Sequence, residues 1–434
     1  MKTNLREKCS ICIPFERSKY DEIIKDSKKF RRHINDTIAH FPELFPVKIT
    51  DGYEMKDSRK SKKLCLCIRR ITVAGKSYSV RPSFVMPYMT GFVCDVENGL
   101  YLRRFDVPFH GLTHVFGRYP MYWYRLENHL GRHSLVGTTV HSAAALPEHL
   151  IADEKHTHIA GEKVFVATTV AENCILGVSM ASNAGEAALT KAYSIFTEEA
   201  KRVKPDYKPK TVNTDGWAAT QKAWRVIFPS ILIICCFLHV FIKIRDRAKL
   251  KFHDKFLEVA SKLWDCYRAD NKKSFSQRIR RLGEWCEAHP DLPAVIVDPI
   301  KKLEKNRQLY AGAYDHPGCH RTSNMLDRLM QRMDRHLFST QYFHGSSDTA
   351  ELNIRGWALI YNFTPSNPMT IKKYQGKKCP ADRLNGFAYS ENWLENLLIS
   401  ASLKDFRCPP IIRYNQDLSN KISPNPSLSK RGTE

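Results

Sequence analysis

Residues 210–237, KTVNTDGWAATQKAWRVIFPSILIICCF, carry the clearest secondary-structure pattern of the chain. The segment Lys210–Asp215 is rich in β-branched residues and ends in an acid, which predicts a buried strand. Ala218–Ile227 has the apolar spacing of a helix, and Ser230–Phe237 has the continuous apolar run of a central strand. The stretch therefore predicts strand, helix and strand, with Asp215 where the first strand ends.

Three further strands and one helix are predicted directly upstream. The strands are Glu148–Glu154, Lys163–Val170 and Cys174–Met180, and Gly185–Val203 is an amphipathic helix. Three strands, helix, strand, helix and strand is the element order of an RNase H-like α/β core. We therefore expect a mixed sheet of that kind, which places functional groups at the ends of its strands.

Residues 1–145 mix helical and strand-like segments, so we expect a separate α+β region there. Tyr20–Ile38 has helical spacing. Within residues 116–145, a helix, a glycine turn and a second short helix resemble a helix-turn-helix, although many helical hairpins look alike. We therefore expect this N-terminal region to bind DNA. Its predicted strands are Leu64–Ile68, Arg70–Val73, Gly91–Val96 and Tyr101–Phe105.

The sheet core is expected to be interrupted. Residues 246–310 are charged, aromatic and helical in pattern, which predicts an all-helical insertion. It would divide the core into a first part, 146–245, and a second part with C-terminal helices, 311–404. A long helix is predicted over 321–343. The tail, 405–434, is rich in Pro, Asn and Ser and is predicted to be disordered.

The chain has a large excess of positive charge. Its 434 residues include 68 Lys and Arg against 45 Asp and Glu, which gives a formal net charge of +23. Such an excess favours a polyanionic partner, most commonly nucleic acid, and the basic runs are spread along the chain, as expected for a protein that follows a DNA path. A basic surface without a partner and a membrane surface are the alternatives.

The 13 cysteines and the N-terminus bear on the compartment. The first residues lack the apolar segment that export requires, so we expect a cytoplasmic bacterial protein with free thiols. Cys9 and Cys12, together with Cys65 and Cys67, are candidate zinc ligands. The two pairs lack the matching spacing of usual zinc motifs, so reduced thiols are the favoured interpretation.

An uncharged segment, Val226–Ile242, resembles a membrane span in its composition. Its 17 residues lie at the short edge of the range for a spanning helix, and it contains Pro229, Ser230 and His239. A buried strand that runs into a helix explains the same segment and is the favoured interpretation, so no membrane is expected as a partner.

Three acids are candidates for a metal site. Cleavage and joining of phosphodiester bonds need two divalent ions, and Mg²⁺ prefers oxygen ligands, so carboxylates must converge. Asp215 and Asp153 each lie at the end of a predicted strand, and Asp327 lies early in the predicted long helix. Because neighbouring strand residues face opposite ways, only one of Asp153 and Glu154 should point into the site, and Asp153 is favoured. Asp334, two turns on, is the fallback for Asp327.

A simpler interpretation of these acids stays open. An acid at a strand end is commonly the N-cap of the next helix, as Asp215 would be for the helix that begins near Ala218. Asp327 would pair with Arg328 or Arg332 on its own helix.

Four short motifs carry a resemblance to a known family. They are Thr214-Asp215-Gly216-Trp217, Phe228-Pro229, Cys236-Phe237-Leu238-His239 and Thr322-Ser323-Asn324-Met325-Leu326-Asp327. The chain resembles Mutator-like (MULE-type) transposases, and bacterial insertion-sequence transposases, along most of residues 145–404. In that family the second catalytic Asp precedes Gly, a helix, a Phe-Pro turn, a strand and a Cys-x-x-His. The third acid follows a helical insertion, within a Thr-Asn-x-x-Glu pattern.

The resemblance implies a DNA transposase that cuts the ends of a transposable element and joins them to target DNA. It implies Asp153, Asp215 and Asp327 as catalytic metal ligands, with two Mg²⁺ or Mn²⁺ ions. The implied partners are double-stranded DNA, as terminal inverted repeats and target, and further copies of the chain in a homo-oligomer. An inactive transposase-derived DNA-binding protein and an RNase H-like nuclease without strand transfer are the alternatives.

The chain departs from the family at Asp327, where Glu is usual. Asp is one methylene shorter, so its carboxylate reaches less far from a helix. Either the helix lies closer, or this copy is impaired, or another acid serves, of which Glu351 is a distant option.

Other residues near these motifs have two interpretations each. Cys236 and His239 form a signature of the related transposases, either for structure or for contact with DNA near the cut, and two ligands alone cannot complete a tetrahedral zinc site. Arg321, Arg328 and Arg332 are expected along the predicted long helix, where they would position phosphate groups or form a plain solvated face.

Overall fold

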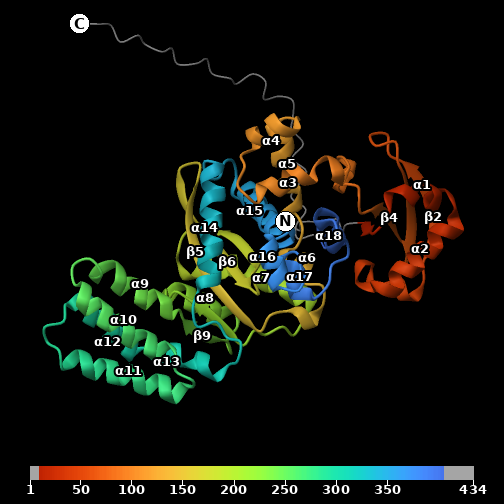
Figure 1. Cartoon of the computed structure of the whole chain (residues 1–434). Helices are drawn as coiled ribbons and strands as arrows, with labels where there is room; N and C mark the ends of the chain where they lie inside the picture. Colours follow the sequence, from red (N-terminus) through yellow and green to blue (C-terminus); the bar gives the residue numbers. More distant parts are fainter. Residues whose placement is uncertain (1–8, 405–434) are drawn as a thin grey trace, which may run out of the picture.

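Two mixed β-sheets organise the chain, which a computed structural model describes over residues 9–404 (Figure 1). The strands of the central sheet are β5 (His149–Ile159), β6 (Glu162–Ala171), β7 (Cys174–Ala181), β8 (Thr211–Thr214) and β9 (Leu232–Cys235). They lie in the order β7-β6-β5-β8-β9. Strand β6 is antiparallel to both of its neighbours, whereas β5, β8 and β9 are parallel. The chain is therefore a mixed α/β protein.

Helices cover both faces of the central sheet. The covering helices are α7 (Glu186–Val203) and α8 (Ala218–Ile227) on one face and α14 (Asn324–Ser339) and α15 (Ser347–Phe363) on the other. Side chains of β5 alternate between these faces: Ile151 packs in the cluster that contains α14 and α15, and Ala152 packs in the cluster of α7 and α8. The alternation fixes which face each acid of β5 can reach.

The predicted order of three strands, helix, strand, helix and strand is found between His149 and Cys235. The apolar segment 226–242 is divided between the end of α8, strand β9 and the start of α9 (Phe237–Ala248). A strand that runs into a helix is thus confirmed for this segment. Within residues 9–404, no helix combines the length and the apolar character needed to cross a membrane.

The N-terminal sheet has the order β1-β4-β3-β2 and is separate from the central sheet. Its strands are β1 (Ser10–Ile13), β2 (Glu54–Lys60), β3 (Cys67–Val73) and β4 (Lys76–Pro82). The helix predicted over Tyr20–Ile38 is interrupted at Asp26, whose carboxylate accepts the backbone N–H groups of Lys28 and Lys29 at 2.7 and 3.2 Å and so begins a new helix. The helices of this region are α1 (Arg17–Lys25), α2 (Ser27–His40), α3 (Glu97–Arg103), α4 (Phe109–Phe116), α5 (Pro120–Leu130) and α6 (Leu135–Thr139).

Two predicted strands of the N-terminal region are wrong. Gly91–Val96 contains a 3-10 turn, and Tyr101–Phe105 lies mostly in α3. The buried side chains Val96, Leu100 and Arg103 follow a helical period rather than an alternating one, and they face α5. The spacing of the buried positions, rather than the β-forming residue types, therefore sets the structure here.

The predicted helix-turn-helix within residues 116–145 is also wrong. Its second helix, α6, is buried along its whole length and packs against α7 and α15. The hydroxyl of Ser134, at its N-cap, donates to Glu199 at 2.7 Å inside the protein. A helix enclosed in this way presents no side chain to a DNA groove.

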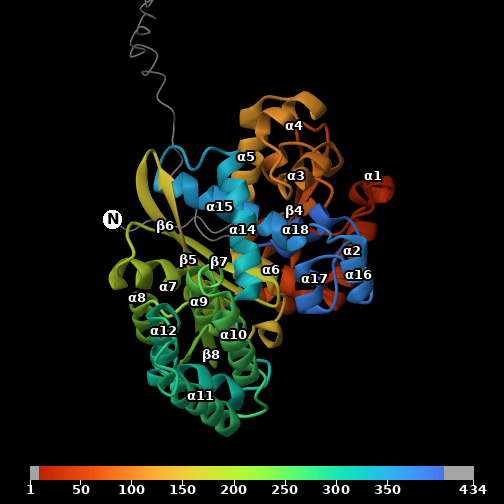
Figure 2. The ribbon, with the colours of Figure 1, turned by 60° about the vertical axis from the view of Figure 1, so that its left-hand side comes forward.

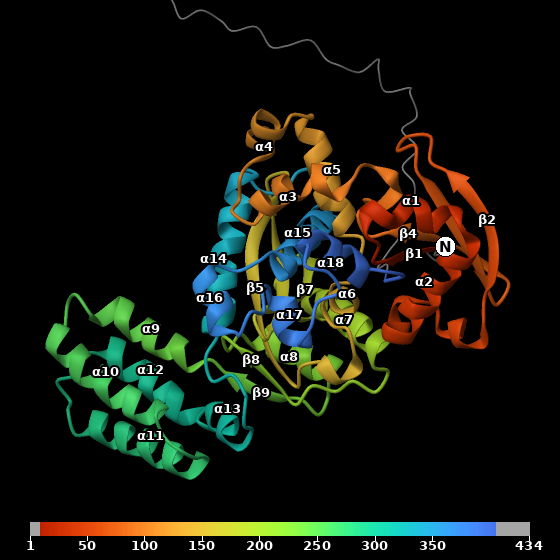
Figure 3. The ribbon, with the colours of Figure 1, turned by 45° about the vertical axis from the view of Figure 1, so that its right-hand side comes forward.

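Five helices form a unit with its own hydrophobic core, here called the helical block (residues 237–311). They are α9, α10 (His253–Tyr267), α11 (Lys272–Glu287), α12 (Ala294–Lys305) and α13 (Gln308–Ala311). Figures 1 and 3 show the block to one side of the central sheet. Its first helix follows β9 directly, so the helical structure begins at Phe237 rather than at residue 246.

The remaining helices and turns complete the described chain. The helix predicted over 321–343 is α14, which is shorter at both ends. The predicted disordered tail, 405–434, lies outside the described residues. The other elements are α16 (Pro368–Lys373), α17 (Pro380–Asn385), α18 (Trp393–Ser400) and the 3-10 turns η1 (Pro42–Leu44), η2 (Val47–Asp51), η3 (Pro87–Met89), η4 (Val93–Asp95), η5 (Ala143–Ala145) and η6 (Gly312–Asp315).

A buried polar network ties α14 to the N-terminal helices, which lie beside it in Figure 2. Arg103 of α3 donates to Glu127 of α5 at 2.6 Å and lies 3.2 Å from Nδ1 of His336 on α14. His336 Nε2 in turn bonds Asn353 of α15 at 3.2 Å, and Asn353 donates to Glu127 at 3.0 Å. Burial lowers the pKa of His336 to about 4, so its ring is neutral near pH 7. The network fixes the helix on which Asp327 lies.

Candidate functional site

Asp153 and Asp215 lie level with each other on neighbouring parallel strands. In the pairing of β5 with β8, Ile151 lies opposite Asn213. Continuing that register by two residues brings Asp153 beside Asp215, directly after the end of β8. Neighbouring strands are about 4.8 Å apart, so the two carboxylates interact at short range.

Glu154, the neighbour of Asp153, faces the other side of the sheet. Its carboxylate accepts hydrogen bonds from the hydroxyl groups of Tyr193 on α7 and Thr220 on α8, both at 2.7 Å. Burial raises the pKa of Glu154, and these two hydrogen bonds oppose that rise. Glu154 therefore anchors two helices, while Asp153 points to the face covered by α14, as the alternation of strand residues predicts.

The pKa of Asp153 is raised to about 7. Burial is the largest cause and the negative charge of Asp215 is the next, while the backbone N–H of Glu154, which donates at 2.8 Å, and the charge of His239 oppose the rise. A hard divalent cation binds such a pair well, because it neutralises the repulsion between the two carboxylates. Asp153 and Asp215 therefore fit one metal ion.

Asp215 also has a structural contact. One oxygen of its carboxylate accepts the backbone N–H of Trp217 at 2.8 Å, where α8 begins. The N-cap of α8 is Trp217, so the helix-cap interpretation of Asp215 is wrong, and its contact belongs to the turn before the helix. The residue is exposed, so this contact leaves the carboxylate open to a ligand from solvent.

Asp327 lies in the first turn of α14 and is held by Ser323. The Ser323 hydroxyl lies 3.1 and 3.0 Å from the two carboxylate oxygens and donates to them. Cys236, at the junction of β9 and α9, lies with its sulfur 3.2 Å from that hydroxyl oxygen and accepts the backbone N–H of Ser323 at 3.2 Å. The Cys of the Cys-x-x-His motif therefore connects the end of β9 to the helix of the third acid.

His239, in the first turn of α9, places a positive charge beside these acids. Its hydrogen bond with Cys236 is the main cause that raises the pKa of His239 to about 9, and the charges of Cys236, Asp327 and Asp215 add to the rise against the effect of burial. Burial opposes ionisation of the Cys236 thiol, but His239 and Ser323 together lower its pKa. The motif thus places a hydrogen-bonded Cys236–His239 pair next to the acids.

The described residues do not assemble the predicted set of three ligands. Within residues 9–404, no three His, Cys, Asp or Glu side chains lie close enough together to hold a metal ion. Asp327 bonds Ser323 instead. Its fallback, Asp334, forms an ion pair with Lys155 at 2.5 Å, and Glu351 lies on α15, which packs against α5. The structure therefore brings Asp153 and Asp215 together on neighbouring strands, while Asp327 is held by Ser323 in the first turn of α14.

The three predicted phosphate-binding arginines have different surroundings. Arg321 precedes α14 and does not lie along it: its guanidinium packs over the rings of Tyr267 and Tyr314, each at 4.8 Å, which is a correction to the expected basic helix face. Arg332 is half-buried and lies over the ring of Tyr361 at 5.8 Å. Arg328 is exposed, and within residues 9–404 it makes no ion pair with an acid. Of the three, only Arg328 presents a free charge.

The candidate zinc ligands of the N-terminal region do not form a cluster in the described part of the chain. Cys12 is buried in β1, whereas Cys9, Cys65 and Cys67 are exposed. Strand β1 pairs with β4, and Cys65 and Cys67 belong to the turn and strand beyond it.

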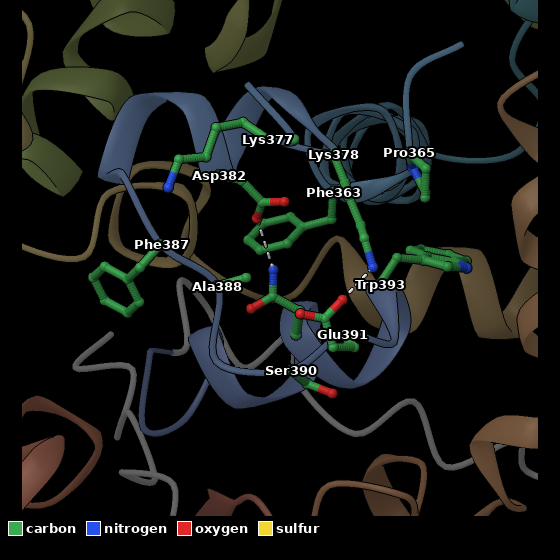
Figure 4. Close-up of a pocket in the computed structure, with 12 residues that line it drawn as sticks. Phe363, Pro365, Lys377, Lys378, Asp382, Phe387, Ala388, Ser390, Glu391 and Trp393 are labelled. Atoms are coloured by element: carbon green, nitrogen blue, oxygen red, sulfur yellow. Dashed lines mark hydrogen bonds and ion pairs between the residues drawn. The ribbon is translucent and has the colours of Figure 1, made fainter. Parts of the chain in front are cut away.

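A cavity of about 150 Å³ lies away from the acids. It is formed by the end of α15, by α17 and α18 and by the loops between them (Figure 4). Its polar side chains pair with each other: Asn396 donates to Asp382 at 3.1 Å, and Lys378 pairs with Glu391. None of the predicted site residues lines this cavity, so it is not the candidate site.

Sequence reasoning missed the role of Ser323. The residue stands in the quoted motif, four positions before Asp327, and side chains four residues apart lie on the same side of a helix. Its contact with Cys236 has no local signal, because 87 positions separate the two residues.

No model of a known protein family matches the chain, and no curated protein sequence does. The function is therefore inferred from the residues and geometry of the site.

Proposed function

We propose that the chain is a DNA transposase whose central sheet is an RNase H-like core. The observation that carries this proposal is the level pair of Asp153 and Asp215 at adjacent parallel strands, with the pKa of Asp153 raised by burial and by Asp215. The strand order β7-β6-β5-β8-β9, with β6 antiparallel, supports the fold assignment. The helical block, which follows β9 and precedes α14, supports an insertion between the second and third acids.

The chain's own residues have separable roles in this proposal. Asp153 and Asp215 would hold a Mg²⁺ or Mn²⁺ ion, and Asp327 is the third acid. Divalent ions at such a site activate the attacking oxygen and stabilise the leaving oxygen of the phosphodiester. His239 places positive charge between the acids, and Glu154 keeps α7 and α8 on the opposite face of the sheet.

Double-stranded DNA is the proposed partner, and the N-terminal sheet carries the surface that supports it. Three of its acids are used internally: Asp57 pairs with Arg70, Glu22 pairs with Lys29, and Asp26 caps α2. Seven exposed cations on α1, α2, β2 and the following turn make no ion pair within the described residues. These cations, called here the basic N-terminal surface, are Lys25, Lys28, Arg32, Lys56, Lys60, Lys62 and Lys63. Figure 3 shows the elements that carry them, α1, α2 and β2, on the right-hand side of the molecule.

The experiment that tests the proposal uses a supercoiled plasmid that carries the DNA flanking the coding sequence on both sides. We expect the purified chain to nick this plasmid with Mg²⁺ and to join the released ends to other DNA. Asp215→Asn should abolish cleavage and leave DNA binding intact, because it removes a metal ligand without changing the fold. Asp334→Asn, which alters an exposed acid paired with Lys155, is the matched control and should cleave as the wild type does.

Product analysis separates the alternatives. Cleaved but unjoined products would identify a nuclease without strand transfer. DNA binding without any metal-dependent cleavage would identify a transposase-derived binding protein, and would overturn the proposed activity. Equal cleavage by Asp215→Asn and wild type would overturn the proposed site.

A further inference from the structure

An exposed tryptophan follows the proposed metal ligand Asp215. The side chain of Trp217 is 39% exposed, and its backbone N–H donates to Asp215 at 2.8 Å. Gly216 between them has a φ of +94°, which makes a sharp turn that few other residues allow. The backbone of Trp217 is thus held by the Asp215 carboxylate, which places the indole at the edge of the proposed metal site.

A β-hairpin lies beside this tryptophan. Strand β5 continues to Ile159, although β8 ends at Thr214, level with Ala152, so the β5–β6 hairpin extends beyond the end of β8 (Figure 1). On this extension, the ring of Phe165 meets Trp217 edge to face, with the centroids 6.2 Å apart. The ammonium of Lys163 lies 5.4 Å from the centre of the Phe165 ring, on the exposed side of the hairpin.

Burial distinguishes Trp217 from an ordinary core residue. Trp224, two helical turns further along the chain on α8, is fully buried and packs against Tyr193, Phe196 and Phe228. Within residues 9–404, Phe165 is the one aromatic ring in contact with Trp217. The exposed part of the indole therefore lies next to Asp215, on the side of the sheet covered by α7 and α8, where a ligand from solvent can reach it.

We propose that Lys163, Phe165 and Trp217 form a binding site for an unpaired nucleotide of a DNA strand at the cleavage site. The indole stacks on the base, and the Lys163 ammonium contacts a phosphate of the same strand. An unpaired base is required because a paired base already stacks on its neighbours within the duplex. The site rests on the proposed transposase function. It extends that function because it requires a base of the strand next to the cut to be unpaired.

The test measures stacking without cleavage. A single-stranded oligonucleotide with one 2-aminopurine is titrated with the full chain in EDTA, and base stacking is followed as quenching of the 2-aminopurine fluorescence. We expect Trp217→Ala to weaken binding about tenfold and to remove the quenching, because one base–aromatic stack contributes that much. Trp217→Phe should retain most of both, and Lys163→Gln should weaken binding and reduce its salt dependence.

The control is Phe338→Ala, which removes another exposed ring, 79% exposed, at the far end of α14. It should bind the oligonucleotide as the wild type does, and Trp217→Ala should bind a fully paired duplex normally. Wild-type affinity and quenching in Trp217→Ala, or an equal loss on duplex DNA, would overturn the site. A Trp217-dependent stack together with normal cleavage by Asp215→Asn would refute the proposed catalytic acids and leave the nucleotide site standing.

Discussion

At the scale of single residues, Ser323 connects the third acid to the end of strand β9. It is 2% exposed, bonds both oxygens of Asp327, and contacts Cys236, which is 1% exposed. Because Asp is shorter than Glu, its reach depends on where its helix and rotamer are fixed. Ser323 fixes both, since it precedes the first turn of α14 and restrains the Asp327 carboxylate.

Two substitutions of Ser323 distinguish the contribution of its hydroxyl group to stability from that of its side-chain volume. We expect Ser323→Ala to lower the free energy of unfolding by about 1–2 kcal/mol, because it removes buried hydrogen bonds from Asp327 and Cys236. Ser323→Thr should lose less, since it keeps the hydroxyl. Urea unfolding of both variants measures the difference, and equal stabilities would show that the hydroxyl does not hold Asp327.

Asp153 predicts a pH dependence of stability. Its pKa in the folded chain, about 7, lies above the ordinary value of 3.8, so the folded state binds its proton more tightly than the unfolded state does. The resulting penalty is absent below about pH 4, grows as the pH rises from about 4 to 7, and stays constant above that range. In EDTA, Asp153→Asn should therefore exceed the wild type in stability by about 4 kcal/mol at pH 8 and by little near pH 4.

Chemical unfolding of both proteins at the two pH values measures this difference. Added Mg²⁺ should stabilise the wild type at pH 8 and leave Asp153→Asn unaffected, because the cation neutralises the carboxylate pair. A stability difference that is the same at pH 4 and pH 8 would contradict the raised pKa.

At the scale of elements, the edge strand β2 and the turn after it carry free positive charge. Lys60, Lys62 and Lys63 are exposed, and Lys60 lies opposite Cys67 on the neighbouring strand. Charged residues on an exposed strand edge also prevent pairing with other chains, so charge alone does not establish binding to DNA. The dependence of binding on salt distinguishes the two roles.

Substitution of all three lysines by Gln should weaken duplex binding. It should also lower the slope of log K against log[salt] by about 0.9 for each phosphate that the variant no longer neutralises. Lys255→Gln with Lys262→Gln is the matched control, since these lysines of the helical block pair with Asp291 and Glu258. A salt slope unchanged by the triple substitution would assign β2 a protective role only.

The elements of the central sheet were predictable because their signals are local. Residue spacing gave α8 with its correct ends, and alternation along β5 correctly separated Asp153 from Glu154. The prediction failed where distant packing decides. Burial of α6 depends on α7 and α15, and the orientation of the Asp327 carboxylate depends on Ser323, which contacts the distant residue Cys236. Neither contact leaves a periodic pattern in the sequence.

At the scale of the whole molecule, the helical block is joined to the start of α14 by Arg321. The guanidinium of this residue packs between Tyr267 and Tyr314, and its carbonyl accepts the backbone N–H of Phe237 at 3.2 Å. The guanidinium also donates to the carbonyl of Tyr267 at 3.2 Å. Arg321 thus holds the block against the segment that leads into the helix of Asp327.

Loss of the Arg321 contacts should increase local unfolding of the helical block without unfolding the central sheet. We expect Arg321→Ala to lose about 1–3 kcal/mol of local stability, from two cation–π contacts and a hydrogen bond, and Arg321→Lys to recover only part, since an ammonium lacks the planar stack. Hydrogen exchange should accelerate in α10 and α11 and stay unchanged in β5 and β6. Arg328→Ala is the control. Hydrogen exchange that accelerates equally across the whole chain would contradict a local role of Arg321.

The buried network of Arg103, Glu127, His336 and Asn353 has a consequence for how the chain can be divided. A fragment that starts at residue 146 would keep His336 and Asn353 but lose the arginine and glutamate that satisfy them, and would expose the apolar side of α15 that packs on α5. The acids therefore lie in a part of the chain that depends on the first 145 residues for its folding. The N-terminal region is therefore expected to change by substitution of its surface residues, and not by replacement of the whole region as a module.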